Sequence, residues 1–174
     1  MCCKVRCHPL KLIVCPLSQL EQALASTPSH VLSLISPGAE APVCPGTAKH
    51  LILRFNDING PAEGLTPAMP ADIETLIAFT RDWQGLAPML AHCWAGISRS
   101  TAAAYIIACL RHPPGHEPFF AEQLRHAAPE ATPNPRMVAL ADTILGREGR
   151  MISAIAAIGR GREAGQGVSF SLKI

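Results

Sequence analysis

The segment "HCWAGISRS", residues 92–100, places a nucleophile and an anion-binding group at a fixed spacing. Cys93 and Arg99 stand six positions apart. That spacing often arises by chance, so the pair alone is weak evidence, but the added histidine, glycine and serine make the pattern specific. The segment joins an apolar stretch, "PMLAHC" at 88–93, to an alanine-rich stretch at 99–112. This setting predicts a loop that leaves a strand and enters a helix.

Such a loop has the chemistry of a phosphate-binding site. Backbone N–H groups of residues 94–99 precede or open the helix, so they lack helical partners and can converge on an anion. Gly96 permits the tight turn, and Arg99 offers a planar fork that can hold two phosphate oxygens. The same positive field favours the thiolate of Cys93, which would make it a nucleophile. The alternative is a buried structural cysteine with Arg99 in a surface ion pair.

Cleavage of a phosphate ester also needs an acid that protonates the departing oxygen. Asp72, Glu74 and Asp82 fall in the expected helix 70–83, where carboxylates commonly lie on a solvated face. Asp57 follows the expected strand 50–55, at the sheet edge where the loops after parallel strands gather. We therefore expect Asp57 to be the general acid, with Asp72 as the alternative. Alternatively, Asp57 has only a structural role, in which its side chain caps backbone N–H groups in a turn.

Short apolar runs alternate with longer helical patterns along the chain. This alternation predicts an α/β fold with a central parallel sheet of four to five strands and helices on both faces. The helix at 99–112 is apolar on nearly every side and should lie buried. The expected strands are 11–15, 30–35, 50–55 and 88–93, and the expected helices are 18–26 (with Ser18 as N-cap), 70–83, 99–112, 117–127, 135–146 and 148–160.

Length and composition limit the kind of protein. The 174 residues predict a single domain over 1–174, with a core at about 10–160 and peripheral segments at 1–9 and 161–174. The pattern leaves open whether the last dozen residues dock. A net charge of +2 gives no reason to expect nucleic acid, and no apolar run is long enough to span a membrane.

The cysteines indicate a reducing compartment. Seven cysteines, an odd number without paired spacing, argue against a disulfide framework and predict a cytoplasmic protein. The N-terminal stretch is better interpreted as a first strand than as a signal peptide, because its apolar part is short and contains a proline. Cys2, Cys3, Cys7 and His8 cluster near the N-terminus, but their spacing matches no standard zinc site, so no metal is expected.

The segment "HCWAGISRS" resembles the signature loop of cysteine-dependent protein tyrosine phosphatases, His-Cys-x5-Arg-Ser/Thr. The form matches the dual-specificity-phosphatase-like branch, of bacterial type. The resemblance implies a phosphatase fold in which Cys93 attacks phosphorus to give a phosphocysteine and Arg99 binds the phosphoryl oxygens. It also implies that Ser100 assists breakdown of the intermediate and that His92 buttresses the loop by hydrogen bonding.

Two further segments resemble the same family. "FNDI" at 55–58 is similar to the segment that bears the general acid, which supports Asp57. "TPNPRMVALAD" at 132–142 is similar to a segment that begins a helix packed near the signature loop. The resemblance covers roughly residues 10–145.

The resemblance implies hydrolysis of phosphotyrosine, with phosphoserine and phosphothreonine left open. The partner would be a phosphorylated protein or a small phosphomonoester, without cofactor, metal, nucleic acid or membrane. Trp94 could stack on a substrate ring or pack beneath the loop, and packing is favoured. The variable loop positions carry no lysine or arginine, which disfavours phosphoinositides. The expected substrate-binding residues are His92, Trp94, Ala95, Gly96, Ile97, Ser98 and Arg99.

Two other functions share part of this pattern. A rhodanese-like sulfurtransferase also places a cysteine in an anion-binding loop, and a pseudophosphatase would bind phosphorylated partners without hydrolysis. An exposed thiolate at Cys93 would be open to oxidation to sulfenic acid, but Cys109 is not placed to resolve it.

Overall fold

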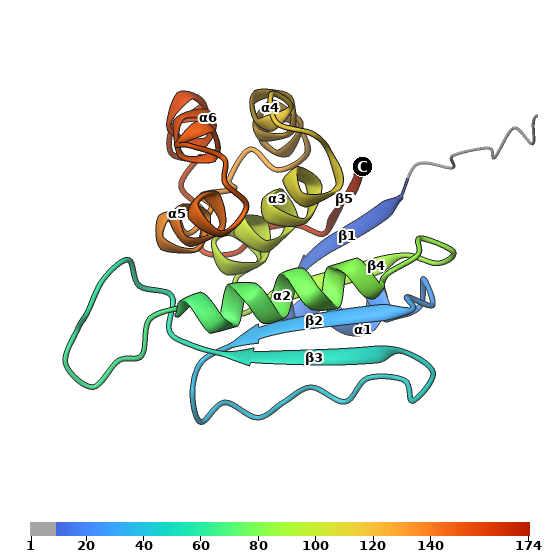
Figure 1. The fold of residues 1–174 in the computed structure, drawn as a ribbon. Coiled ribbons are helices and arrows are strands. Elements are labelled where there is room, and N and C mark those ends of the chain that lie inside the picture. Colours follow the sequence, from blue (N-terminus) through green and yellow to red (C-terminus); the bar gives the residue numbers. More distant parts are fainter. Residues whose placement is uncertain (1–9) are drawn as a thin grey trace, which may run out of the picture.

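A five-stranded sheet runs through the centre of the computed structural model, which describes residues 10–174 (Figure 1). The order is β3-β2-β4-β1-β5, in which the first four strands are parallel and β5 is antiparallel to β1. The expected α/β fold and its four sequence-predicted strands are thus confirmed. The fifth strand differs from the rest in direction. The strands are β1 (Lys11–Pro16), β2 (His30–Ile35), β3 (Lys49–Arg54), β4 (Met89–Cys93) and β5 (Phe170–Lys173).

Helices cover both faces of the sheet, but unequally. The larger face carries five helices, of which α3 lies against β1 and β4 and is buried beneath α4 and α5. The other face is covered by the short α1 and the 3-10 turn η1. The elements are η1 (Leu17–Gln19), α1 (Leu20–Leu24), α2 (Pro70–Asp82), α3 (Arg99–Arg111), α4 (Glu117–Ala127), α5 (Pro135–Ile144) and α6 (Arg150–Ile158).

Alternation along the central strands builds two hydrophobic cores. In β1, Leu12 and Val14 face the large helical layer, whereas Ile13 and Cys15 face α1. Because both faces of the sheet are covered, the sequence of β1 is a nearly continuous apolar run. The sheet therefore holds the ends of β1, β2 and β4 rigidly side by side, and the loops that follow them meet at one edge.

The expected N-cap at Ser18 is wrong. Ser18 lies inside the 3-10 turn, and α1 begins after Gln19 without a side-chain cap. The chain is constrained there because Leu17 N–H donates to the carbonyl of Trp94 directly after the strand ends. The Ser18 hydroxyl accepts a hydrogen bond from the Gln166 side chain instead.

The C-terminal segment, whose docking the sequence left open, packs onto the domain. β5 pairs with β1 over four residues, and Leu172 is buried in the core. Upstream of β5, Gly167 N–H donates to the carbonyl of Ala95 at 2.8 Å, so this segment also supports the loop at 92–100. The sequence signal for β5 was weak because the strand is only four residues long and follows a glycine-rich stretch.

Two further expectations concern a metal site and a membrane-spanning segment. The cluster of Cys2, Cys3, Cys7 and His8 lies outside the described residues. Within residues 10–174, no three histidine, cysteine or acidic side chains gather as a metal site. In the same range, no helix has the length and apolar character needed to cross a membrane.

Candidate active site

The loop at 92–100 connects β4 to α3, as predicted. β4 ends at Cys93, and α3 begins at Arg99. Gly96 turns the chain with φ of +71°, and a Cβ atom there would lie 2.7 Å from the backbone nitrogen of Pro16. Both the left-handed conformation and the close approach therefore require glycine at this position.

Carbonyl groups of the loop point away from its centre. Those of Trp94 and Ala95 accept from Leu17 N–H and Gly167 N–H, at 3.2 and 2.8 Å. The Ile97 carbonyl accepts from Thr132 N–H at 2.9 Å, and the Ser98 carbonyl accepts from two further backbone N–H groups. Within residues 10–174, the N–H groups of Trp94, Ala95, Ile97 and Ser98 donate to no protein acceptor. With the positive end of α3 behind them, these donors form an anion-binding nest.

Cys93 lies at the base of this nest. The side chain is almost fully buried, and Gly96 N–H donates to its Sγ at 3.2 Å. The hydroxyl of Ser100, buried at the start of α3, lies 3.2 Å from the same sulfur. The Gly96 N–H points at the sulfur, and the Ser100 hydroxyl can donate to it when it carries a negative charge, which suits a thiolate nucleophile and leaving group.

Burial makes two other cysteine thiols harder to deprotonate than usual. Burial raises the pKa of Cys15 to about 12, with the charge of Cys93 as a smaller cause, and burial also raises the pKa of Cys109 to about 12. These two side chains remain protonated thiols at neutral pH and are poor nucleophiles.

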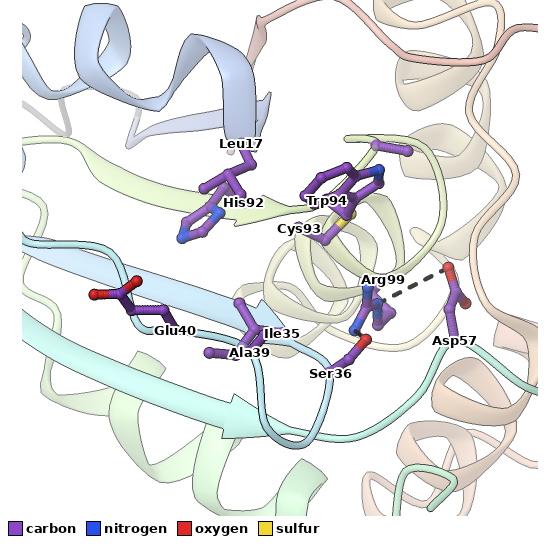
Figure 2. Close-up of a pocket in the computed structure, with 11 residues that line it drawn as sticks. Leu17, Ile35, Ser36, Ala39, Glu40, Asp57, His92, Cys93, Trp94 and Arg99 are labelled. Atoms are coloured by element: carbon purple, nitrogen blue, oxygen red, sulfur yellow. Dashed lines mark hydrogen bonds and ion pairs between the residues drawn. The ribbon is translucent and has the colours of Figure 1, made fainter. Parts of the chain in front are cut away.

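Arg99 is buried and only partly paired. Its Nη1 donates to the carbonyl of Phe55 at 2.8 Å, which fixes one side of the guanidinium. Its Nε is buried and has no hydrogen-bond partner among the described residues. The nearest carboxylate oxygen, Oδ2 of Asp57, is 3.9 Å from Nε (Figure 2). A buried cation with an unused donor is costly without a ligand, so this edge is suited to an incoming anion.

Asp57 lies beside the loop, at the sheet edge where the sequence placed it. Its Oδ1 accepts from Ser98 Oγ at 2.7 Å and from Asn134 Nδ2 at 2.8 Å. Asn134 is itself fixed, because its Oδ1 caps α5 by accepting from Met137 N–H at 3.0 Å. These bonds hold the Asp57 carboxylate over the anion nest while its other oxygen stays available.

The remaining carboxylates have other roles. Asp72, the alternative acid, accepts from Met69 N–H at 2.7 Å and caps α2. Asp82 pairs with Lys49 and His30. Neither residue lines the pocket at Cys93, and nor does Glu74.

A pocket of about 500 Å³ opens onto the sulfur of Cys93 (Figure 2). Of the sequence-predicted residues, it brings together His92, Cys93, Trp94, Ala95, Arg99 and Asp57. Gly96, Ile97, Ser98 and Ser100 shape the loop without lining the pocket. Five lining residues were not predicted from the sequence, because they follow β1 or come from the end of β2 and the segment after it: Leu17, Ile35, Ser36, Ala39 and Glu40.

Trp94 does not pack beneath the loop, so that expectation is wrong. Its side chain is 73% exposed and lies at the wall of the pocket. The space under the loop is already filled, because Pro16 approaches Gly96 closely and the Trp94 carbonyl is bonded to Leu17. The indole is therefore free to contact a ligand in the pocket.

His92 supports the loop from within the sheet. It is fully buried, and its Nε2 lies 2.6 Å from Ser33 Oγ on β2. Burial, followed by the charges of His50 and Arg99, lowers the pKa of His92 from 6.5 to about 4. The ring is thus neutral at physiological pH, which fits a buttress better than a proton donor.

The neutral state of His92 predicts a loss of stability in acid. Between pH 6.5 and about 4, the unfolded chain binds a proton that folded His92 does not, so folding stability falls as the pH drops through this window. For this group we expect a loss of about 3 kcal/mol. Urea unfolding at about pH 7 and about pH 4.5 should show a smaller loss in His92→Gln, which keeps a polar atom toward Ser33 but does not titrate. Equal losses in both proteins would contradict the assignment.

Comparisons with solved structures place this fold among the dual-specificity phosphatases. Human DUSP28 superposes with a TM-score of 0.58 and 18% identity, over 84% of this chain and 94% of that chain. DUSP15 superposes with a TM-score of 0.57 and 18% identity, over 84% and 89%. The Yvh1 phosphatase domain of Chaetomium thermophilum superposes with a TM-score of 0.57 and 17% identity, over 80% of this chain and 93% of that chain. Neither a protein-family model nor a curated protein matches the sequence.

At these identities the likeness establishes the fold. The chain has the α/β fold of cysteine-dependent tyrosine phosphatases in their dual-specificity form, which confirms the resemblance at that level.

Proposed function

We propose that this protein is a phosphatase that hydrolyses phosphate monoesters, phosphotyrosine in particular, through a phosphocysteine intermediate. The observation that carries the proposal is a convergence of three groups in one pocket. The Cys93 sulfur, the unpaired edge of Arg99 and the Asp57 carboxylate meet beside a nest of free N–H groups. A dianionic phosphoryl group fits such a nest, and a phosphatase fold supports the interpretation.

In the first step, the phosphoryl oxygens bind the nest and the free donors of Arg99. The Cys93 thiolate attacks phosphorus and forms the S–P bond while the ester oxygen departs. Asp57, protonated at the start, gives its proton to that oxygen. Preorganised donors then stabilise the charge on the equatorial oxygens, which is the largest contribution expected from the protein.

In the second step, Asp57 accepts a proton from water as the water attacks phosphorus and the S–P bond breaks. The departing thiolate regains the hydrogen bond from Gly96 N–H. Ser100 Oγ, 3.2 Å from the sulfur, can donate to it as charge returns. Inorganic phosphate leaves, and the enzyme is restored without any cofactor in these steps.

Release of phosphate from para-nitrophenyl phosphate tests the proposal directly. We expect turnover by the folded wild-type protein, because this substrate needs only the phosphate site. Inert folded protein, across aryl and alkyl phosphate monoesters, would overturn the proposal. Sulfur transfer from thiosulfate to cyanide in the same preparation would support the sulfurtransferase alternative, and binding of phosphopeptide without turnover would support the pseudophosphatase alternative.

The pocket walls support an aromatic monophosphate. Among residues 10–174, Arg99 is the only lysine or arginine that lines the pocket, and Glu40 adds a negative charge at the end away from Asp57 (Figure 2). The apolar side chains of Leu17, Ile35 and Trp94 can contact a phenyl ring. The related structure of PTPMT1 was determined in complex with PI(5)P, at 16% identity and a TM-score of 0.56. In the part of the chain that the structure describes, the present pocket has none of the extra cations that would favour a polyanionic headgroup.

Reversing the charge at Glu40 should broaden the substrate range. We expect wild-type kcat/KM to be at least about tenfold higher for a phosphotyrosine peptide than for a soluble inositol bisphosphate. Glu40→Lys should raise kcat/KM for the inositol bisphosphate by about three- to tenfold, because an added cation near the pocket attracts its second phosphate. Glu122→Lys on the exposed side of α4 makes the same change in net charge and should leave the ratio unchanged. An equal effect of both variants would contradict a local role for Glu40.

The substrate in the cell would be a phosphorylated protein or a small phosphomonoester. The described cysteines, Cys15, Cys44, Cys93 and Cys109, are all free thiols. Their free state, together with the odd number in the chain, supports a cytoplasmic location.

A further inference from the structure

Three polar side chains connect the active-site loop to the edge of the sheet. His92 Nε2 lies 2.6 Å from Ser33 Oγ, and the same Oγ lies 2.7 Å from His50 Nε2. Ser33 and His92 are paired in neighbouring strands and are completely buried. His50, on the edge strand β3, is only half-buried. This chain of contacts gives the buried loop histidine a route to a side chain that solvent can reach.

The serine hydroxyl has a single proton, which links the two histidines. Within residues 10–174, Ser33 Oγ has no third hydrogen-bond partner. If both rings donated to it, its own proton would be buried without an acceptor, which is unfavourable. One histidine must therefore donate to Ser33 while the other accepts, so their tautomers are coupled.

A buried nitrogen of His92 determines which groups donate along these hydrogen bonds. Its Nδ1 is inaccessible and has no hydrogen-bond partner among the described residues. A buried N–H without an acceptor is less tolerated than a lone pair without a donor. At neutral pH, His92 therefore carries its proton on Nε2 and donates to Ser33, which donates to His50 Nε2.

Protonation of His50 reverses the direction of donation along these hydrogen bonds. A charged imidazole donates from both nitrogens, so Ser33 must then donate to His92. One proton from solvent binds His50 Nε2, and His92 exchanges its Nε2 proton for one on Nδ1, with a net uptake of one proton. His92 stays neutral, because burial lowers its pKa to about 4. His50 is the ring that solvent can reach, and partial burial lowers its pKa below the ordinary value.

We propose that Ser33 and His50 are positioning residues for the catalytic loop, and that protonation of His50 changes the tautomer of His92 beside Cys93. When His50 is charged, one buried donor is left without an acceptor, either the Ser33 hydroxyl or the His92 Nδ1–H. Of the two residues only His92 lines the pocket, so a shift of the loop can give its Nδ1–H an acceptor. The groups that face His50 are Ser33 of β2, Cys44 with Sγ at 3.7 Å, and, through Ser33, His92 of β4. Lys49 precedes it on its own strand and pairs with Asp82, and none of the ion pairs within residues 10–174 includes His50.

Two variants of His50 distinguish coupling through these hydrogen bonds from a role of its side chain in packing alone. His50→Gln keeps an acceptor toward Ser33 but cannot titrate, so it should hold His92 in the Nε2–H form at every pH. His50→Leu removes the acceptor, so Ser33 should donate to His92 permanently and hold it in the Nδ1–H form. The glutamine and leucine side chains are similar in size, and His50 does not belong to the proposed catalytic machinery.

Nitrogen-15 NMR of the histidine rings reads the tautomers directly, with the His92 signals assigned by their loss in His92→Gln. In the wild type we expect Nε2–H at about pH 7.5 and Nδ1–H once the His50 signals show protonation. His50→Gln should show only Nε2–H, and His50→Leu only Nδ1–H. A His92 tautomer that ignores the His50 titration, or that is the same in both variants, would overturn the proposal.

The effect on activity rests on the proposed function, whereas the NMR measurement does not. Between about pH 7.5 and the pH at which His50 is charged, wild-type kcat/KM should fall about tenfold more than that of His50→Gln. His50→Leu should be about tenfold slower than His50→Gln at the higher pH, with no further pH effect from this site. If all three proteins are inactive but the tautomers follow the expected pattern, the proposed function fails and the coupling stands. Identical pH profiles in active proteins would overturn the positioning role.

Discussion

Replacing Cys93 with serine is expected to lower phosphatase turnover by about 10⁴-fold or more, with the fold intact. The Gly96 N–H donates to the Cys93 sulfur, and the Ser100 hydroxyl lies close enough to donate to a thiolate there, as the proposed mechanism requires. A serine hydroxyl at the same site stays protonated at neutral pH and attacks phosphorus poorly. The smaller Oγ fits without strain, so phosphate binding to the nest and Arg99 should persist. Steady-state hydrolysis, thermal unfolding and phosphate binding measured on one preparation check these three expectations.

Cys109→Ala is the matched control for this variant. Cys109 is buried in the same helix that follows the loop, but it does not line the pocket. The control should lose some stability from a small cavity and keep its turnover within about threefold. Turnover by Cys93→Ser close to that of the wild type would remove Cys93 from the mechanism.

Replacing Asp57 with asparagine should lower kcat by about 10²–10³-fold on a phosphotyrosine peptide. Asparagine can still accept from Ser98 and Asn134, so the geometry is retained while the proton is lost. The loss should be smaller on para-nitrophenyl phosphate, because its leaving group departs with little help from an acid. Comparing the two substrates therefore distinguishes a lost acid from a lost binding contact.

Asp72→Asn is the corresponding control, and it also tests the alternative acid. Asp72 caps α2 through Met69 N–H, and an asparagine oxygen can accept the same hydrogen bond, so this variant should keep both its stability and its kcat. The reverse outcome, with activity lost in Asp72→Asn and kept in Asp57→Asn, would transfer the acid role to Asp72.

Much of this site could be predicted from the sequence, because it depends on local pattern. Gly96 could be predicted to turn the chain, since the left-handed φ and the contact with Pro16 tolerate no side chain. The alanine-rich run after Arg99 predicted a buried helix, which α3 confirms. Asp57 could be placed at the correct sheet edge because the loops after parallel strands gather there.

Contacts between distant segments were beyond sequence reasoning. The bonds from Asn134 and Ser98 to Asp57 bring together residues 77 and 41 positions apart. An asparagine before Pro135 does signal a helix cap, but nothing local indicates that its amide would also donate to Asp57. The exposure of Trp94 depends in the same way on Pro16 and Leu17, which fill the space under the loop from another strand end.

A covalent phosphate on Cys93 is the central claim, and mass spectrometry of the trapped intermediate tests it most directly. Ser100→Ala should slow breakdown of the intermediate, because the hydroxyl beside the sulfur is removed. Acid quenching of this variant during turnover of para-nitrophenyl phosphate, followed by digestion, should yield the peptide containing Cys93 with one added phosphoryl group. Phosphate release without any such adduct, or with the phosphoryl group on another side chain, would contradict the mechanism proposed for this protein.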